Sequence, residues 1–189
     1  FERKIVQMRT RKLSQGAAAV AMAAALSMII LYQLPNGGNV TAAGMAPIIL
    51  YSFLYGPGWG LLTSFVYALI QMLMGFYPPP APGLWQFLLA ALLDYIFAFG
   101  ALGLAGAVGK PFGRWGPVIG TFAVIAARFV CHFLSGVLIW PAYAPEGTPA
   151  WAYSLTYNGS YLLAELVLTL AVVALLLRTG AFQRIRDGR

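Results

Sequence analysis

Four ionisable side chains lie inside long apolar runs of this chain of 189 residues, where a charge has a high energetic cost. Asp94 is the only charged residue between positions 13 and 109, and the later apolar runs contain Arg128, His132 and Glu165. Such groups can hydrogen-bond, pair with one another or balance the charge of a bound ion. Ionisable residues buried in a membrane are usually functional and have a partner, so these four residues are the first candidates for a site.

The predicted depths of Asp94 and His132 place these two side chains at one level. Each helical residue advances 1.5 Å along the helix axis. Asp94 follows the predicted start of its helix at Leu84 by ten residues, and His132 precedes Trp140 by eight. Both therefore lie about 12–15 Å from the same end of the helices, and we expect them to meet.

Two interpretations of the four ionisable residues remain open, and both pair Arg128 with Glu165. Arg128 lies one helical turn from His132 on the same face, while Glu165 lies seven residues beyond Asn158 on the last predicted helix. In the first interpretation, Asp94 and His132 form a second structural link between helices. In the second, Asp94 beside an uncharged His132 forms an anionic pocket, which favours a cation.

Aromatic and amide side chains near this level complete a candidate binding site. Trp140 lies two turns from His132 on a similar face. Tyr153 and Asn158 supply a phenol and a carboxamide at the start of the last helix. Together with a carboxylate and an imidazole, these groups suit a flat heterocycle with a positive charge, held by hydrogen bonds and cation–π contact. The residues alone leave the identity of this ligand open.

The elements that position these residues are predicted to be membrane-spanning helices. Hydrophobic residues make up 60% of the chain and charged residues only 9%, against about 25% charged in soluble domains. Pro, Gly and Asn clusters separate apolar runs, most of which are long enough to span a bilayer. The sequence therefore predicts one all-α integral membrane domain over residues 1–189, with six transmembrane helices at about 14–34, 43–55, 58–76, 84–108, 117–140 and 155–177.

The basic residues predict the orientation of this domain in the membrane. The net charge is +7, but five of the twelve Lys and Arg lie in the first twelve residues and four lie at or after Arg178. Lys110 and Arg114 share one short loop between predicted helices. This distribution follows the positive-inside rule, which places both termini in the cytoplasm. The basic residues therefore argue for the lipid bilayer and against nucleic acid as a partner.

Motifs for other chemistry are missing from the sequence. No G-x-x-x-x-G-K-[ST] loop exists, so the chain cannot power transport with ATP by itself, and neither G-x-S-x-G nor H-E-x-x-H occurs. Ser135 lies three residues from His132, but no oxyanion-hole motif accompanies this pair. A single cysteine provides neither a disulfide framework nor a clustered metal site. From these absences together we expect no catalytic residue, no metal site and no cofactor.

The first predicted helix carries a ridge of small residues. Ala17, Ala21 and Ala25 recur every four residues and allow another helix to approach closely. Packing within the chain and docking onto another membrane subunit are both compatible with this ridge, because alanine-rich surfaces are not specific.

Four stretches of the chain together resemble the YuaJ (ThiT) family, the thiamine-specific substrate-binding components of energy-coupling-factor (ECF) transporters. The stretches are PNGGNV at 35–40, QFLLAALLDYIFAFGALGLAG at 86–106, RFVCHFLSGVLIW at 128–140 and YAPEGTPAWAYSLTYNGSY at 143–161. The resemblance implies a multi-pass subunit of the bacterial cell membrane that captures thiamine outside. Its partners are then a transmembrane coupling subunit, which docks on an A-x-x-x-A face, and two ATPase subunits. Thiamine is the ligand, and no cofactor is implied.

The resemblance also implies which residues bind the ligand. Some relatives have Trp and an acidic residue in the first outer segment, where this chain has Asn39 and Thr41, so the contacts to the hydroxyethyl end of thiamine stay open. The alternative from another class is an intramembrane enzyme or a structural subunit of a membrane complex. The implied thiamine-binding positions are Asp94, Tyr95, His132, Trp140, Tyr153, Asn158 and Tyr67.

Overall fold

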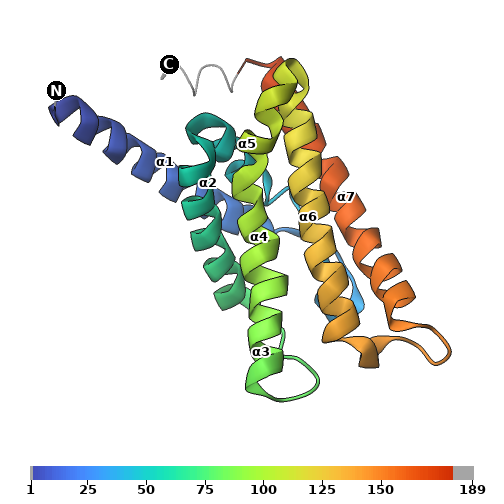
Figure 1. Ribbon diagram of the computed structural model, residues 1–189. Coiled ribbons are helices and arrows are strands. Elements are labelled where there is room, and N and C mark those ends of the chain that lie inside the picture. Colours follow the sequence, from blue (N-terminus) through green and yellow to red (C-terminus); the bar gives the residue numbers. More distant parts are fainter. Residues whose placement is uncertain (1, 181–189) are drawn as a thin grey trace.

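Helices account for most of residues 2–180, the part of the chain that this computed structural model describes (Figure 1). The basic residues Arg184, Arg186 and Arg189 lie outside the described part. The long helices are α1 (Glu2–Met28), α2 (Ala46–Gly75), α6 (Gly116–Leu138) and α7 (Ala150–Arg178), and the shorter ones are α3 (Leu84–Ala90), α4 (Ala98–Gly100) and α5 (Ala105–Gly109). A π-helical segment (Ala91–Phe97) and 3-10 segments (Ala101–Leu104 and Lys110–Trp115) connect α3 to α6 without a break.

Helix α2 turns back on itself in the middle. Gly56 has a φ of +78°, which favours glycine, and Pro57 follows it. A methyl group on Gly60 would lie 2.9 Å from Cβ of Ser52, whereas eight residues of straight helix span about 12 Å. The two halves of α2 are therefore antiparallel, and they correspond to the predicted helices 43–55 and 58–76.

The helical run from Leu84 to Leu138 also reverses once. Gly113, with a φ of +52°, lies in the turn between α5 and α6. Figure 1 shows α3, α4 and α5 in one column and α6 returning beside it. Three helical stretches of the described chain are long and apolar enough to cross a membrane: Ala46–Gly75, Leu84–Leu138 and Ala150–Leu177. The composition and the structure thus agree on a helical membrane protein.

The expectation of a purely helical chain is wrong at the end of the first predicted helix. Helix α1 stops at Met28, and strand β1 (Ile30–Gln33) pairs antiparallel with strand β2 (Asn39–Thr41). The turn between the strands needs left-handed backbone at Asn36 (φ +63°) and Gly37 (φ +92°), residue types that adopt it readily. The β-branched and aromatic residues of 30–33 favour a strand once such a turn follows them.

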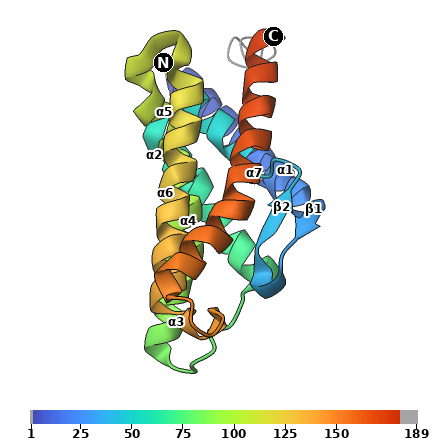
Figure 2. The ribbon, with the colours of Figure 1, turned by 90° about the vertical axis from the view of Figure 1, so that its right-hand side faces the viewer.

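The β1–β2 hairpin lies along helix α7 (Figure 2). Its contacts fall on one face of α7, because the α7 residues recur about every four positions. From the base of the hairpin to its tip, Thr41 bonds Glu165, Val40 packs on Tyr161 and Leu162, Gly38 bonds Tyr157, and Asn36 bonds Tyr153.

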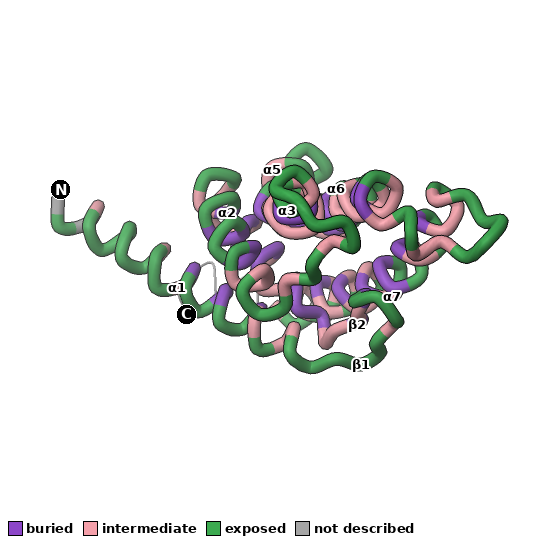
Figure 3. Tube along the Cα trace, turned by 90° about the horizontal axis from the view of Figure 1, so that it is seen from below, coloured by how far each residue is buried: buried purple, intermediate pink, exposed green. Residues whose placement is uncertain are grey.

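Glycines allow the second half of α2 to pack backbone to backbone against the segment Ala101–Leu104. A methyl group on Gly103 would overlap the backbone of Gly60, and one on Gly60 would overlap the carbonyl of Gly103. Viewed end-on in Figure 3, the buried residues lie between α2, α5, α6 and α7, while the first half of α1 projects away and is largely exposed. Close backbone approach at small residues is how helices associate in membranes.

Replacing Gly103 with Ala should lower the stability of the folded chain by about 1–3 kcal/mol, because the added methyl forces two backbones apart. The matched control is Gly100→Ala in the same column, where the new methyl meets nothing within 4 Å. Thermal unfolding in detergent, followed by circular dichroism, should show a lower midpoint only for Gly103→Ala. Equal midpoints for the two variants would contradict this packing.

Candidate functional site

A cavity of about 1080 Å³ lies between the hairpin, α2, the π-helical segment, α6 and α7. Its volume is at the upper end of the range for small-molecule sites. Its walls combine aromatic rings with carboxylate, imidazole, guanidinium and amide groups. All seven predicted binding residues line it: Tyr67, Asp94, Tyr95, His132, Trp140, Tyr153 and Asn158.

Asp94 stands in the wall of this cavity with donors on both carboxylate oxygens. Oδ1 lies 3.0 Å from Nδ1 of His132. Oδ2 accepts from the hydroxyl of Ser135 at 2.6 Å and from the indole Nε1 of Trp140 at 3.3 Å. The predicted meeting of Asp94 and His132 is confirmed, and α6 together with the turn that follows it supplies the donors for a carboxylate on a different helix.

In the π-helical segment, the side chains of two neighbouring residues, Asp94 and Tyr95, contact different helices. Asp94 faces α6, whereas the hydroxyl of Tyr95 donates to the carbonyl of Gly75 at 2.9 Å and accepts from the backbone N–H of Tyr77 at 3.0 Å. Tyr95 therefore joins this segment to the end of α2 while its side chain lines the cavity. Single π-helical turns inside α-helices often occur at functional sites.

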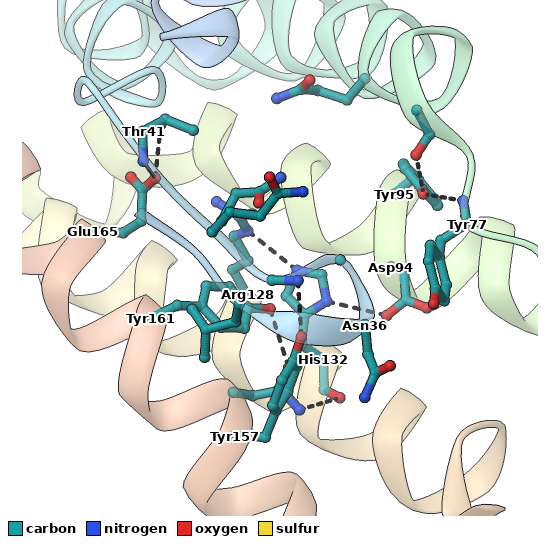
Figure 4. Close-up of a pocket in the computed structure, with 18 of the residues that line it drawn as sticks. Asn36, Thr41, Tyr77, Asp94, Tyr95, Arg128, His132, Tyr157, Tyr161 and Glu165 are labelled. Atoms are coloured by element: carbon teal, nitrogen blue, oxygen red, sulfur yellow. Dashed lines mark hydrogen bonds and ion pairs between the residues drawn. The ribbon is translucent and has the colours of Figure 1, made fainter. Parts of the chain in front are cut away.

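Arg128 fixes the tautomer of His132. The guanidinium Nε donates to Nε2 of His132 at 3.3 Å, and a guanidinium has no acceptor. Nε2 must therefore be unprotonated, so the neutral ring carries its proton on Nδ1 and donates it to Asp94 (Figure 4). Arg128 also contacts Sδ of Met45 at 2.9 Å and lies 4.2 Å from the centre of the Phe99 ring.

The expected ion pair between Arg128 and Glu165 is wrong within the described residues. Arg128 donates to His132, and no hydrogen bond or ion pair joins it to Glu165 in the described part of the chain. Glu165 instead accepts two hydrogen bonds from Thr41, one from its backbone N–H at 2.6 Å and one from its hydroxyl at 2.7 Å. The hairpin, which the sequence did not predict, brings these donors to Glu165.

Asn158 and Tyr153 are held differently at the cavity wall. The amide nitrogen of Asn158 donates to the carbonyl of His132 at 3.2 Å, and its oxygen accepts from the hydroxyl of Tyr161 at 3.1 Å. Asn158 thus ties α7 to α6 behind the imidazole. Tyr153 accepts a hydrogen bond from Asn36 at the tip of the hairpin and stacks on Tyr157, 5.5 Å between ring centres.

Tyr67 lies on helix α2, lines the cavity and is fully buried. Its hydroxyl lies 2.5 Å from that of Ser27 and accepts from Nε2 of Gln71 at 2.7 Å. Its ring meets Phe99 edge to face, 5.4 Å between centres. This cluster of α1 and α2 residues gives the cavity a polar patch away from Asp94.

Several residues of the site escaped the sequence analysis. Ser135 was considered only as a nucleophile, yet it donates to Asp94. Tyr157 and Tyr161 share the spacing of four with Tyr153 and Glu165, a pattern that could have placed all of them on one face. The hairpin residues had no such signal, because their position depends on strand pairing.

The alanine ridge of α1 points away from the rest of the chain. Ala17, Ala21 and Ala25 are exposed, while Ala19 and Ala23 form part of the buried face. The interpretation that the ridge packs within the chain is therefore wrong. Its docking onto another membrane subunit stays a prediction.

The neutral Nδ1–H tautomer of His132 can be observed directly, because this is the only histidine in the chain. NMR of protein labelled with nitrogen isotope in histidine should show, near neutral pH, a proton on Nδ1 and none on Nε2. A proton on Nε2, or on both nitrogens, would contradict the Arg128–His132–Asp94 arrangement.

Comparisons with known proteins place the chain among membrane transporters. The family model described as thiamine transporter protein (Thia_YuaJ) matches residues 13–183. The thiamine transporter ThiT of Bacillus subtilis is 34% identical over 175 residues, covering 87% of this chain and 86% of the relative. ThiT of Lacticaseibacillus paracasei is 33% identical over 181 residues, covering 83% and 84%. A solved structure of ThiT from Listeria monocytogenes has the same fold, with a TM-score of 0.75, 24% identity, and coverage of 92% of this chain and 97% of that one.

Proposed function

Because the chain belongs to the thiamine transporter protein (Thia_YuaJ) family, we propose that it captures thiamine in the cavity beside Asp94. The observation that carries this proposal is a carboxylate in the cavity wall whose neighbouring imidazole is neutral. Thiamine joins an aminopyrimidine, which offers N–H donors, to a positively charged thiazolium ring. A carboxylate can accept hydrogen bonds from the aminopyrimidine. Aromatic rings, in a cavity whose net charge is negative, suit the positively charged thiazolium.

The charge of the cavity supports a cationic ligand. Asp94 and Glu165 are carboxylates and Arg128 is a cation, so with His132 neutral the four lining groups have a net formal charge of −1. In an apolar bundle this charge is poorly screened, and a monocation compensates it. The net charge is the same whether or not Arg128 and Glu165 form an ion pair.

The chain is a bacterial membrane protein. We propose that it crosses the membrane six times with both termini in the cytoplasm, and the chain reversals support this topology. With reversals at Gly56 and Gly113, the three long apolar stretches give five crossings, and α1 is the sixth crossing in this proposal. An even number of crossings places both termini on the same side, and the basic residues place that side in the cytoplasm. The part of the cavity that is lined by Tyr77, Trp140 and Tyr143, from the loops that precede α3 and α7, then faces outward.

We further propose that this chain works as the substrate-binding subunit of an ECF-type importer, with a coupling subunit and two ATPase subunits. The exposed ridge of α1 is the docking face in this proposal, since its alanines lie away from the chain's own core. The sequence contains no nucleotide-binding loop, so in this proposal the partners supply the ATP hydrolysis that drives uptake.

Replacing Asp94 with Asn should weaken thiamine binding by about 10- to 100-fold, the range expected when a hydrogen bond to a charged group is lost. The matched control is Glu146→Gln, which removes a carboxylate from an exposed loop outside the cavity. Binding can be followed by quenching of the fluorescence of Trp140, which lines the cavity. No saturable response in folded wild-type protein would refute the proposed function.

Replacing Ala21 with Trp should block thiamine uptake by cells while leaving thiamine binding to the purified chain intact, because the bulky ring prevents close helix approach. The control is Met22→Trp, an exposed position around the helix from the ridge. Equal loss of uptake in both variants, or loss of binding in Ala21→Trp, would count against docking at the ridge.

A further inference from the structure

Glu165 is a buried carboxylate that forms no ion pair with a cation among residues 2–180. It is 2% exposed and lies in the middle of the apolar helix α7. Its Oε1 accepts both hydrogen bonds from Thr41, and its Oε2 has no hydrogen-bond partner among the described residues. An uncompensated carboxylate in such surroundings is costly and calls for a positive charge nearby.

The nearby cation of the chain is directed elsewhere. Arg128 points Nε at His132 and Nη1 at Met45, and its guanidinium lies against the Phe99 ring. Through His132, its hydrogen bonding continues to Asp94. Hydrogen bonds therefore connect Arg128 to Asp94, whereas no chain of hydrogen bonds among the described residues joins Arg128 to Glu165.

Glu165 lines the same cavity as Asp94 but at another level. It follows Asn158 by seven residues on α7, which corresponds to about 10 Å along the helix, and Asn158 is bonded to His132 beside Asp94. Figure 4 shows Glu165 and Asp94 on opposite sides of Arg128 and His132. The cavity is thus lined by two carboxylates that lie on opposite sides of Arg128 and His132.

We propose that Glu165 is the counter-ion of the cationic ring of the ligand, while Asp94 recognises its hydrogen-bond donors. This inference rests on thiamine as the ligand, whose aminopyrimidine and thiazolium form the two ends of a short molecule. Thr41 is a positioning residue, because its N–H and hydroxyl hold Oε1 and thereby orient the carboxylate. Glu165 then determines specificity for a cation over a neutral heterocycle.

The test compares thiamine with the neutral aminopyrimidine alcohol that corresponds to one half of it. In Glu165→Gln, affinity for thiamine should fall by about 10- to 100-fold, the range of a charge-assisted contact, while affinity for the neutral half stays unchanged. In Asp94→Asn, affinity for both compounds should fall. Calorimetric titration of the purified chain measures both constants, with Glu146→Gln as the control for loss of a carboxylate outside the cavity.

Variants of Thr41 separate positioning from general damage to the fold. Thr41→Val removes the hydroxyl donor but keeps the backbone donor, so thiamine affinity should fall less than in Glu165→Gln, and Thr41→Ser should restore it. Unchanged thiamine affinity in Glu165→Gln, or equal losses for thiamine and the neutral half, would overturn the inference. Failure of the wild-type chain to bind thiamine would instead overturn the proposed function.

Discussion

A carboxylate buried in an apolar bundle needs hydrogen-bond donors where it lies, and the arrangement around Asp94 follows from that need. The π-helical segment turns Asp94 towards α6 and the turn after it, where an imidazole, a hydroxyl and an indole N–H meet its two oxygens. Arg128 keeps the imidazole neutral by donating to it from the other side. The group that faces the cavity is therefore an oriented carboxylate rather than half of an ion pair, which leaves its charge available to a ligand.

The hairpin between α1 and α2 completes the cavity on the side of α7. Strand β1 buries little apolar surface against the helices, because all four of its residues are exposed. The position of the hairpin is set instead by polar contacts with α7 at intervals of four residues, from Glu165 to Tyr153. A strand pair against one helix is a feature that a bundle of helices can carry only next to a cavity or at a membrane surface, where its backbone groups find partners.

The sequence predicted the features that depend on local composition and helical spacing. The apolar runs, their turns and the contact between Asp94 and His132 all follow from hydrophobicity and a rise of 1.5 Å per residue. The hairpin did not follow, because pairing of Ile30 with Thr41 is decided by contacts between distant parts of the chain. The partner of Glu165 was mistaken for the same reason: Arg128 was the nearest cation on the predicted helices, whereas the actual donors belong to the hairpin.

The roles proposed for Asp94 and Glu165 require thiamine to occupy the space between these two carboxylates. A structure of the chain determined with thiamine bound, in lipid or detergent, tests this most directly. We expect the aminopyrimidine within hydrogen-bonding distance of Asp94 and the thiazolium on the side of Glu165. Thiamine bound outside the cavity, or inside it without contact to Asp94, would contradict the proposed binding site.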